Sequence, residues 1–158
     1  MAKRSFESHS QYQRANRETD VVYTANKWKK IKLMDGETRS IHPNALLNYE
    51  RAVIPRSKLE DYALNPAHTD GRHKARLFKS ILGFDKSNWE HLAKIIFDEL
   101  PFHEALPGGE GIFGKKFTVF LPVVGPNGNT AIVETIWIIR PETDYPSFVT
   151  PRTIKEMR

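Results

Sequence analysis

The stretch Asn65-Pro-Ala-His-Thr-Asp-Gly-Arg-His-Lys-Ala-Arg-Leu-Phe-Lys-Ser-Ile-Leu-Gly83 runs from a polar loop into a short amphipathic helix. Lys74 lies on the apolar side of that helix at about 100° per residue. A lysine on the core side of a helix is disfavoured unless its amine reaches solvent or a partner. Lys74 and the nearby loop residue His68 are therefore the unusual residues of the segment. The expected apolar side of a helix over 72–82 consists of Ala75, Leu77, Phe78, Ile81 and Leu82.

Further helix signals flank this segment. Residues 57–60 have the Ser-x-x-Glu pattern of a capping box and predict a helix to about Leu64. Residues 87–90 repeat the pattern and predict a helix to about Leu100. Gly83 suits the C-cap of the helix between them. The sequence thus predicts consecutive short helices before residue 101.

The later part of the chain has the pattern of strands. Residues 107–111, Pro-Gly-Gly-Glu-Gly, are expected to form a flexible loop. Residues 115–123 and 130–140 flank Gly-Pro-Asn-Gly, which predicts a hairpin, and another strand is expected near 147–150. The segment 130–140 is apolar on nearly both sides, as in a central strand with helices on one side. The expected fold class is α+β, with N-terminal helices packed on one face of an antiparallel β-meander of about four strands.

Charge is distributed unevenly along the chain of 158 residues, whose 39% apolar content suffices for a core. Of a net charge of +5, residues 1–45 supply a surplus of four, from nine Lys or Arg and five Asp or Glu. We therefore expect a basic, partly disordered extension at 1–50, with a short hairpin at 21–33, and a compact domain at 51–158. The lysine run around Trp28 is either a solvated segment or a surface that follows a phosphate backbone.

Several classes of protein and site are disfavoured by composition. No run approaches the ~20 apolar residues of a membrane span, and residues 1–6 lack the apolar region of a signal peptide. We expect no membrane partner, and a cytoplasmic location or secretion by a signal-independent route. The chain has no Cys, and its six His show no metal-ligand spacing. We therefore expect neither a metal nor another cofactor.

The loop and helix start at 65–76 hold the first candidates for chemistry. His68 is either an ordinary surface histidine or a general acid or base, because imidazole titrates near neutrality. Asp70 precedes the helix and is expected to be its N-cap. A helix N-terminus offers free amides and a positive dipole end, which suit a phosphate. The basic residues expected to assist there are Arg72, Lys74 and Arg76.

The strand expected at 130–140 carries the other candidates. Alternation places Glu134 and Arg140 on one face, and Trp137, which we assign to the core, on the opposite face. Glu134 and Arg140 are about 20 Å apart along the strand, so each belongs either to an ion pair across the sheet or to a site on its open face. Arg140 stands at the strand end, where it can reach a phosphate. Weaker candidates for substrate contact are Thr135, Thr150 and Arg152.

Four motifs occur in a characteristic order: Lys-Leu-x-x-Tyr at 58–62, Asn-Pro-x-His-x-x-Gly-x-x-Lys-Ala-x-x-Phe-x-x-x-Leu-Gly at 65–83, Gly-Pro-Asn-Gly at 125–128 and Trp-Ile-Ile-Arg-Pro at 137–141. The pattern resembles a family of small uncharacterised bacterial and phage-associated domains, found alone and as C-terminal modules of secreted toxins. The order of elements is similar to that of ribonuclease toxins of the barnase, EndoU, colicin and RelE type. Position by position, the resemblance points to His68, Gly71, Lys74, Phe78, Trp137 and Arg140.

The resemblance implies a toxin-type, metal-independent ribonuclease that cleaves RNA by transesterification, with an acidic immunity or antitoxin protein as partner. In that scheme His68 removes the proton of a 2′-hydroxyl, and Lys74 and Arg140 stabilise the phosphoryl charge. Arg72, Arg76, Thr135 and Thr150 would contact the substrate. The alternative is a non-enzymatic module that binds nucleic acid or protein, in a phage or structural context. The enzyme hypothesis requires His68, Lys74 and Arg140 to converge.

Overall fold

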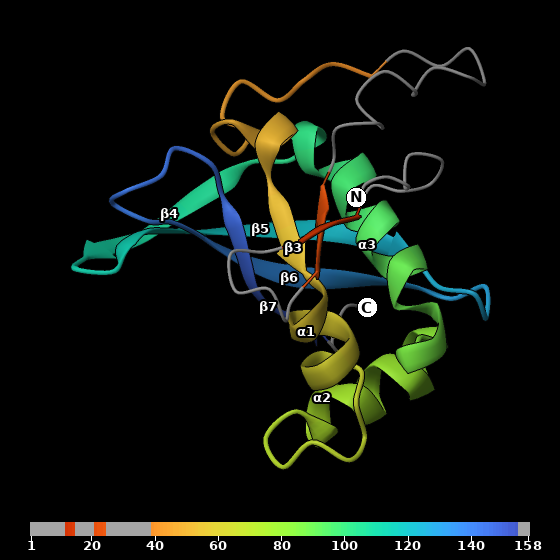
Figure 1. Cartoon of the computed structure of the whole chain (residues 1–158). Coiled ribbons are helices and arrows are strands. Elements are labelled where there is room, and N and C mark those ends of the chain that lie inside the picture. Colours follow the sequence, from red (N-terminus) through yellow and green to blue (C-terminus); the bar gives the residue numbers. More distant parts are fainter. Residues whose placement is uncertain (1–11, 15–20, 25–38, 155–158) are drawn as a thin grey trace.

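The computed structural model describes residues 12–14, 21–24 and 39–154. It shows one sheet with helices beside it (Figure 1). The helices are α1 (Arg56–Lys58), continued by a π-helical turn at Leu59–Ala63, α2 (Arg72–Leu77), continued by a π-helical turn at Phe78–Leu82, and α3 (Trp89–Glu99). The strands are β1 (Tyr12–Arg14), β2 (Val21–Thr24), β3 (Val53–Pro55), β4 (Ala105–Gly111), β5 (Gly114–Val124), β6 (Thr130–Ile139) and β7 (Ser147–Ile154).

The sheet has the strand order β1-β2-β3-β7-β6-β5-β4. Strands β4 to β7 form an antiparallel meander, whereas β3 pairs with β7 in parallel through Val53 and Ser147. The α+β class is therefore correct, but the sheet is mixed and wider than the meander that the sequence predicts. Beyond Ser147, β7 pairs with β6 along one edge. The helices α1 and α2 also contact β7.

Alternation along β6 divides the sheet into two faces. The core face carries Val133 and Trp137, which are buried in one cluster with residues of α3 and of the π-helical turns that continue α1 and α2. Trp137 is therefore a core residue, as its pattern predicts. The opposite face, here called the open face, carries Glu134 and its cross-strand partners Phe120 on β5 and Arg152 on β7. Figure 1 shows α3 on one side of β5 and β6, with α1 and α2 together below them.

The helix over 72–82 begins and ends where the sequence predicts. Gly83 terminates it with a φ of 89°, in the left-handed region that favours glycine. Ala75, Phe78 and Leu82 are buried as expected. Leu77 is the exception, because 37% of its surface is exposed, so the buried face is narrower than the helical wheel suggests.

Three helix starts differ from the sequence pattern. Ser57 does not cap α1, whose N-cap is Pro55, and Glu60 instead pairs with Arg56. The capping box before α3 consists of Asp85 and Asn88 around a short 3-10 turn, not of Ser87 and Glu90. Asp70 does not cap α2. In each case a residue near the expected position offers the competing hydrogen bond or ion pair.

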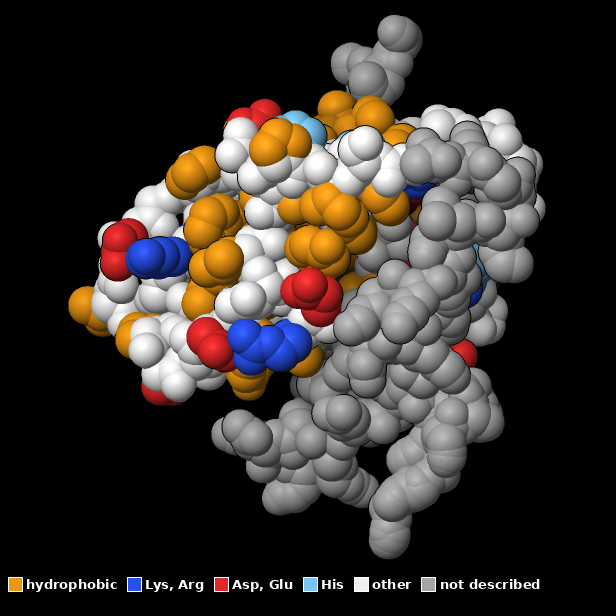
Figure 2. All heavy atoms as spheres, turned by 90° about the horizontal axis from the view of Figure 1, so that it is seen from above, with side chains coloured by type: hydrophobic (Ala, Val, Ile, Leu, Met, Phe, Trp, Pro, Cys, Tyr) orange, Lys and Arg blue, Asp and Glu red, His pale blue; other side chains and the backbone are white. Residues whose placement is uncertain are grey.

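The glycine-rich segment at 107–111 is not a loop. It belongs to β4, which pairs with β5 from Ala105 to Gly111 and contains an irregularity between Pro107 and Gly109. Because backbone groups alone form the pairing, the glycine-rich composition of the segment does not indicate the strand. At the tip of this hairpin Ile112 and Phe113 are 83% and 72% exposed. Figure 2, which views the molecule from above, shows hydrophobic side chains at this left-hand end beside charged ones.

The segment before residue 51 contributes to the same sheet. Strand β2 pairs with β1 on one side and with β3 on the other. The hairpin expected at 21–33 is therefore replaced at Val21–Thr24 by a pairing with an earlier strand, and residues 25–38 lie outside the described residues. Leu46 is buried in the core, and Arg51 forms a salt bridge with Asp144. Among the described helices the longest, α3, has 11 residues, too few to cross a bilayer.

Candidate functional site

His68 is built into the loop that starts α2. Its Nδ1 atom accepts hydrogen bonds from the backbone N–H groups of Asp70 and Gly71, each at 3.0 Å. Its own N–H donates to the carbonyl of Asn65, and its carbonyl accepts from the N–H of Arg72. His68 thus performs the capping role that the sequence suggests for Asp70. With Nδ1 engaged as an acceptor, the neutral ring carries its proton on Nε2.

Tyr62 connects the unusual residues of the motif. The ring of His68 meets the Tyr62 ring edge-on, with centroids 5.0 Å apart. The Lys74 amine lies 5.9 Å from the centroid of the same ring. A Cβ atom at Gly71 would lie only 2.1 Å from the Tyr62 carbonyl oxygen, so the close approach of α2 to Tyr62 requires glycine. Residues 62–74 therefore form a packed corner, with the Lys74 amine beside the Tyr62 ring.

Lys74 also lies within electrostatic range of the open face of the sheet. Burial is the main cause that lowers the pKa of its amine, the positive charge of Arg152 lowers it further, and Glu134 opposes the shift. Arg152 and Glu134 form a salt bridge, with Nε and a terminal nitrogen each 2.7 Å from Glu134 Oε1. Only 18% of the Glu134 side chain is exposed, against 60% for Arg152. Glu134 thus pairs with Arg152 and lies within electrostatic range of Lys74, while the Arg152 side chain stays largely exposed.

Residues 45–155 match the model of a family described as a domain of unknown function, DUF6883. The chain belongs to the DUF6883 family. The matched segment includes Tyr62, Lys74, Glu134 and Arg152, so the whole cluster lies within the DUF6883 domain. No curated protein and no solved structure matches the chain.

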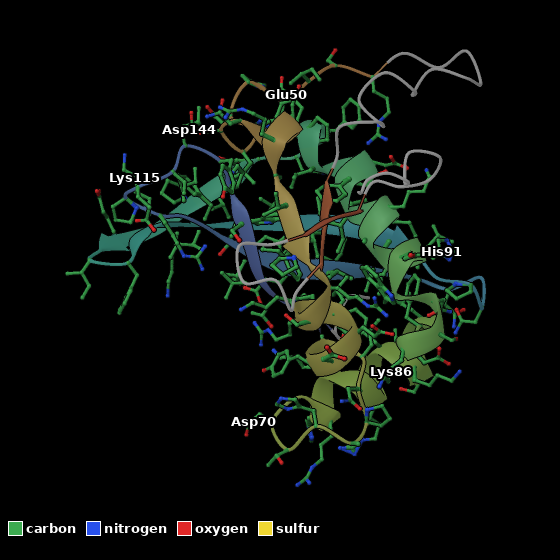
Figure 3. All side chains as sticks on the ribbon, viewed as in Figure 1. Glu50, Asp70, Lys86, His91, Lys115 and Asp144 are labelled. Atoms are coloured by element: carbon green, nitrogen blue, oxygen red, sulfur yellow. The ribbon has the colours of Figure 1, made fainter. Side chains whose placement is uncertain are left out.

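The DUF6883 domain does not bring Arg140 into this cluster. Arg140 follows the end of β6, six residues beyond Glu134, or about 20 Å along a strand. Its Cα atom lies next to Gly114, at the start of β5. Figure 3 labels Asp70 in the loop before α2 and Lys115 on β5, the strand whose start lies beside Arg140. His68 and Lys74 each lie beside the Tyr62 ring, whereas Arg140 lies beside Gly114, so the three residues do not converge as the enzyme hypothesis requires.

The residues predicted to contact substrate have different surroundings in the DUF6883 domain. Arg72 and Arg76 are exposed on α2, and Arg76 contacts the His73 ring at 2.9 Å. Thr135 is fully buried: its hydroxyl donates to the Val119 carbonyl and accepts from the Trp137 indole N–H. A substrate cannot reach Thr135, so its assignment to substrate contact is wrong.

Thr150 lies on the open face, two residue pairs along the β6–β7 register from the salt bridge. It stands opposite Ile136, just as Arg152 stands opposite Glu134. Its hydroxyl is buried and has no hydrogen-bond partner among the described residues. A buried hydroxyl is closed to a substrate, so the contact expected of Thr150 stays a prediction.

Two members of the cluster, Tyr62 and Arg152, are not prominent in sequence. Tyr62 has the pattern of an ordinary apolar helix residue. The only sequence signal for it is its place at the end of the Lys-Leu-x-x-Tyr motif, six residues before His68. Arg152 follows a proline near the end of the last strand, and its partner Glu134 can be found only from the β6–β7 register. No group of three or more His, Cys, Asp or Glu able to hold a metal occurs in the part of the chain that the structure describes.

Proposed function

We propose that the domain is a toxin-type, metal-independent ribonuclease that cleaves RNA by transesterification at Lys74, Glu134 and Arg152. The observation that supports this proposal is the meeting of one carboxylate and two cations where α2 reaches the open face of the sheet. Phosphoryl transfer requires a base for the attacking hydroxyl and positive charge for the phosphoryl oxygens. The cluster supplies both within one site.

Each residue has a role that its surroundings favour. Glu134 removes the proton from a ribose 2′-hydroxyl, whose oxygen attacks the adjacent phosphorus. Arg152 binds the phosphoryl oxygens, on which negative charge increases. Lys74 gives a proton to the departing 5′-oxygen, because an amine with a lowered pKa is a stronger acid than an ordinary lysine. The products are a 2′,3′-cyclic phosphate and a 5′-hydroxyl.

His68 takes a positioning role in this scheme. Its Nδ1 lone pair already accepts two backbone hydrogen bonds, so proton uptake there would break both. We therefore transfer the general-base role from His68 to Glu134. His68 keeps the helix start and Tyr62 in place, and thereby places Lys74.

A cleavage assay on total RNA tests the proposal. Purified parent, Glu134→Gln and Lys74→Met proteins are incubated with RNA in the presence of chelator, and the cleaved ends are analysed for cyclic phosphate. Glu134→Gln should reduce the rate by about 10²- to 10⁴-fold, as expected when a general base is removed. The exposed residues Glu142 and Lys86 supply matched controls, Glu142→Gln and Lys86→Met, that should cleave like the parent. A fully active Glu134→Gln protein, or cleavage abolished by chelator, contradicts the mechanism.

The second candidate is a non-enzymatic module that binds nucleic acid or protein. Two observations favour it: His68 is committed to the loop, and Arg140 is remote from Lys74. Under this proposal the cations bind a phosphate without cleaving it. Expression in cells without a protective partner separates the two, because a ribonuclease should be toxic and a binder harmless. For the enzyme, we expect the partner to be an acidic inhibitor that covers Lys74 and Arg152. We expect it to act in the cytoplasm of a target cell, which it reaches by signal-independent secretion.

A further inference from the structure

Phe120 extends the Glu134–Arg152 pair into a row across the open face. It lies directly opposite Glu134 in the β5–β6 register, just as Arg152 lies opposite Glu134 in the β6–β7 register. Neighbouring strands are separated by about 4.8 Å, so Phe120 is roughly 5 Å from Glu134 and roughly 10 Å from Arg152 in the direction across the strands. The row thus presents an aromatic ring, a carboxylate and a guanidinium in order.

The Phe120 ring is accessible, since 40% of its surface is exposed. Trp137 and Phe148, by contrast, pack edge-to-face against each other in the core. Besides Glu134 and Thr118, the open face around Phe120 carries the apolar, half-buried residues Pro122, Ile132 and Ile136. A flat ring among apolar side chains, next to a site for phosphate, has the chemistry that binds an unpaired base by stacking.

We propose that Phe120 is the stacking platform for a base of single-stranded RNA, held while the adjacent phosphate is bound at Arg152. This inference rests on the proposed function, because it identifies the form of RNA that the same site accepts. Stacking requires a base face that is free of its neighbours, so a duplex is excluded and single-stranded segments are selected. Every base has such a face, so the platform imposes only weak sequence preference.

Binding of an oligonucleotide that cannot be cleaved tests the platform separately from the chemistry. The probe is a short single-stranded 2′-deoxy oligonucleotide with a fluorescent label, titrated with parent protein at low salt. Phe120→Ala should weaken binding by about tenfold or more, because stacking on one aromatic contributes about 1–3 kcal/mol. Phe120→Trp should retain the affinity, whereas Phe120→Leu, which is apolar without being aromatic, should not. Phe113→Ala removes the other exposed phenylalanine of the β4–β5 hairpin and should bind like the parent.

The possible results separate the platform from the ribonuclease. The platform would be overturned if parent and Phe120→Ala bound equally, or if Phe113→Ala and Phe120→Ala lost affinity equally. Equal affinity for single strand and duplex would overturn it as well. If the oligonucleotide binds in a Phe120-dependent way while the parent leaves RNA intact, the ribonuclease falls and the platform stands. If the parent cleaves RNA and Phe120→Ala cleaves it with unchanged KM, the ribonuclease stands and the platform falls.

Discussion

The backbone N–H of Gly71 donates a 3.0 Å hydrogen bond to Nδ1 of His68. A side chain that reads as a catalytic base is therefore part of the helix start, together with the Asp70 N–H that donates to the same nitrogen. Because both bonds point at one lone pair, the tautomer of His68 is fixed by the backbone. Because His68 is engaged in the loop, we propose the general base on the sheet, at Glu134.

Replacing His68 should affect stability more than the chemical step. His68→Ala leaves two N–H groups at the start of α2 without their acceptor, at a cost of about 1–2 kcal/mol in the free energy of unfolding. His68→Asn, which can accept the same bonds, should recover part of that loss. Urea denaturation and RNA cleavage at saturating substrate measure the two effects. A stable His68→Ala protein with a rate lowered by about 10²-fold or more would restore His68 as the base.

Substitution of Gly71 should be more damaging than its size suggests. In Gly71→Ala the new Cβ would meet the Tyr62 carbonyl at 2.1 Å, so α2 must shift away from Tyr62. We expect a loss of about 1–3 kcal/mol, typical of overpacking, measured by thermal or urea unfolding. Gly111→Ala is the matched control, because a Cβ there has no neighbour within 4 Å. Similar stability of the two variants would show that the corner tolerates a side chain.

Lys74 should make stability depend on pH in the alkaline range. Its pKa is lowered in the folded protein by burial and then by Arg152, so the unfolded chain binds more protons between the folded and unfolded values. Stability therefore rises with pH across that window, and the penalty for the charged amine is complete below it. Lys74→Met should be more stable than the parent at pH 7, and the difference should shrink as the pH rises toward 10. A difference that stays constant with pH contradicts the assignment.

Asp85 should stabilise the fold in its ionised form. Hydrogen bonds from Ser87 and Lys79 lower its pKa from 3.8 to about 2. This contribution is complete above the unfolded value and is lost as the pH falls through about 2. Asp85→Ala should cost about 1 kcal/mol at pH 7, because the capping box before α3 is lost. The gap between parent and Asp85→Asn in acid denaturation should close below pH 4; a gap that persists would refute the assignment.

Arg152, which pairs with Glu134, and Arg140, which follows the end of β6, should behave differently. Arg152→Ala removes the cation that contacts Glu134 and should lower RNA cleavage by about 10²-fold. Arg140→Ala, at the far end of β6, should cleave within about twofold of the parent, since only the general attraction for RNA is reduced. Initial rates on the same RNA compare them directly. Equal losses in both variants would mean that substrate spans the whole strand.

The helix and the hairpin strands were predictable because local pattern determines them. The run from Arg72 to Gly83 combines a helical period with a glycine terminator, and strands β5 and β6 alternate around a strong turn signal. Strand β4 was not predictable, because Pro-Gly-Gly-Glu-Gly has no apolar alternation and is held only by backbone pairing with β5. Pairing of that kind depends on a partner strand that the local sequence does not reveal.

The candidate site was only half predictable for a similar reason. Lys74 is conspicuous because its charge interrupts the apolar face of one helix, and such a signal can be recognised from local sequence alone. Arg152 and Glu134 meet through the β6–β7 register, which contains an irregularity between Ile136 and Trp137. That shift in register cannot be read from either strand alone. Arg140 was overvalued because the end of a strand is exposed whether or not a site lies there.

The pairing of β2 with β3 also determines where the N-terminal boundary of an expressed fragment should lie. The family match begins at residue 45, whereas β2 lies at Val21–Thr24, so a fragment cut to the family boundary loses the strand that covers β3. The peptide groups of Val53 and Ile54 would then form an uncovered sheet edge, which invites strands of other chains to add on. We therefore expect such a fragment to aggregate through the edge left by the missing β2 strand rather than through an unstable core.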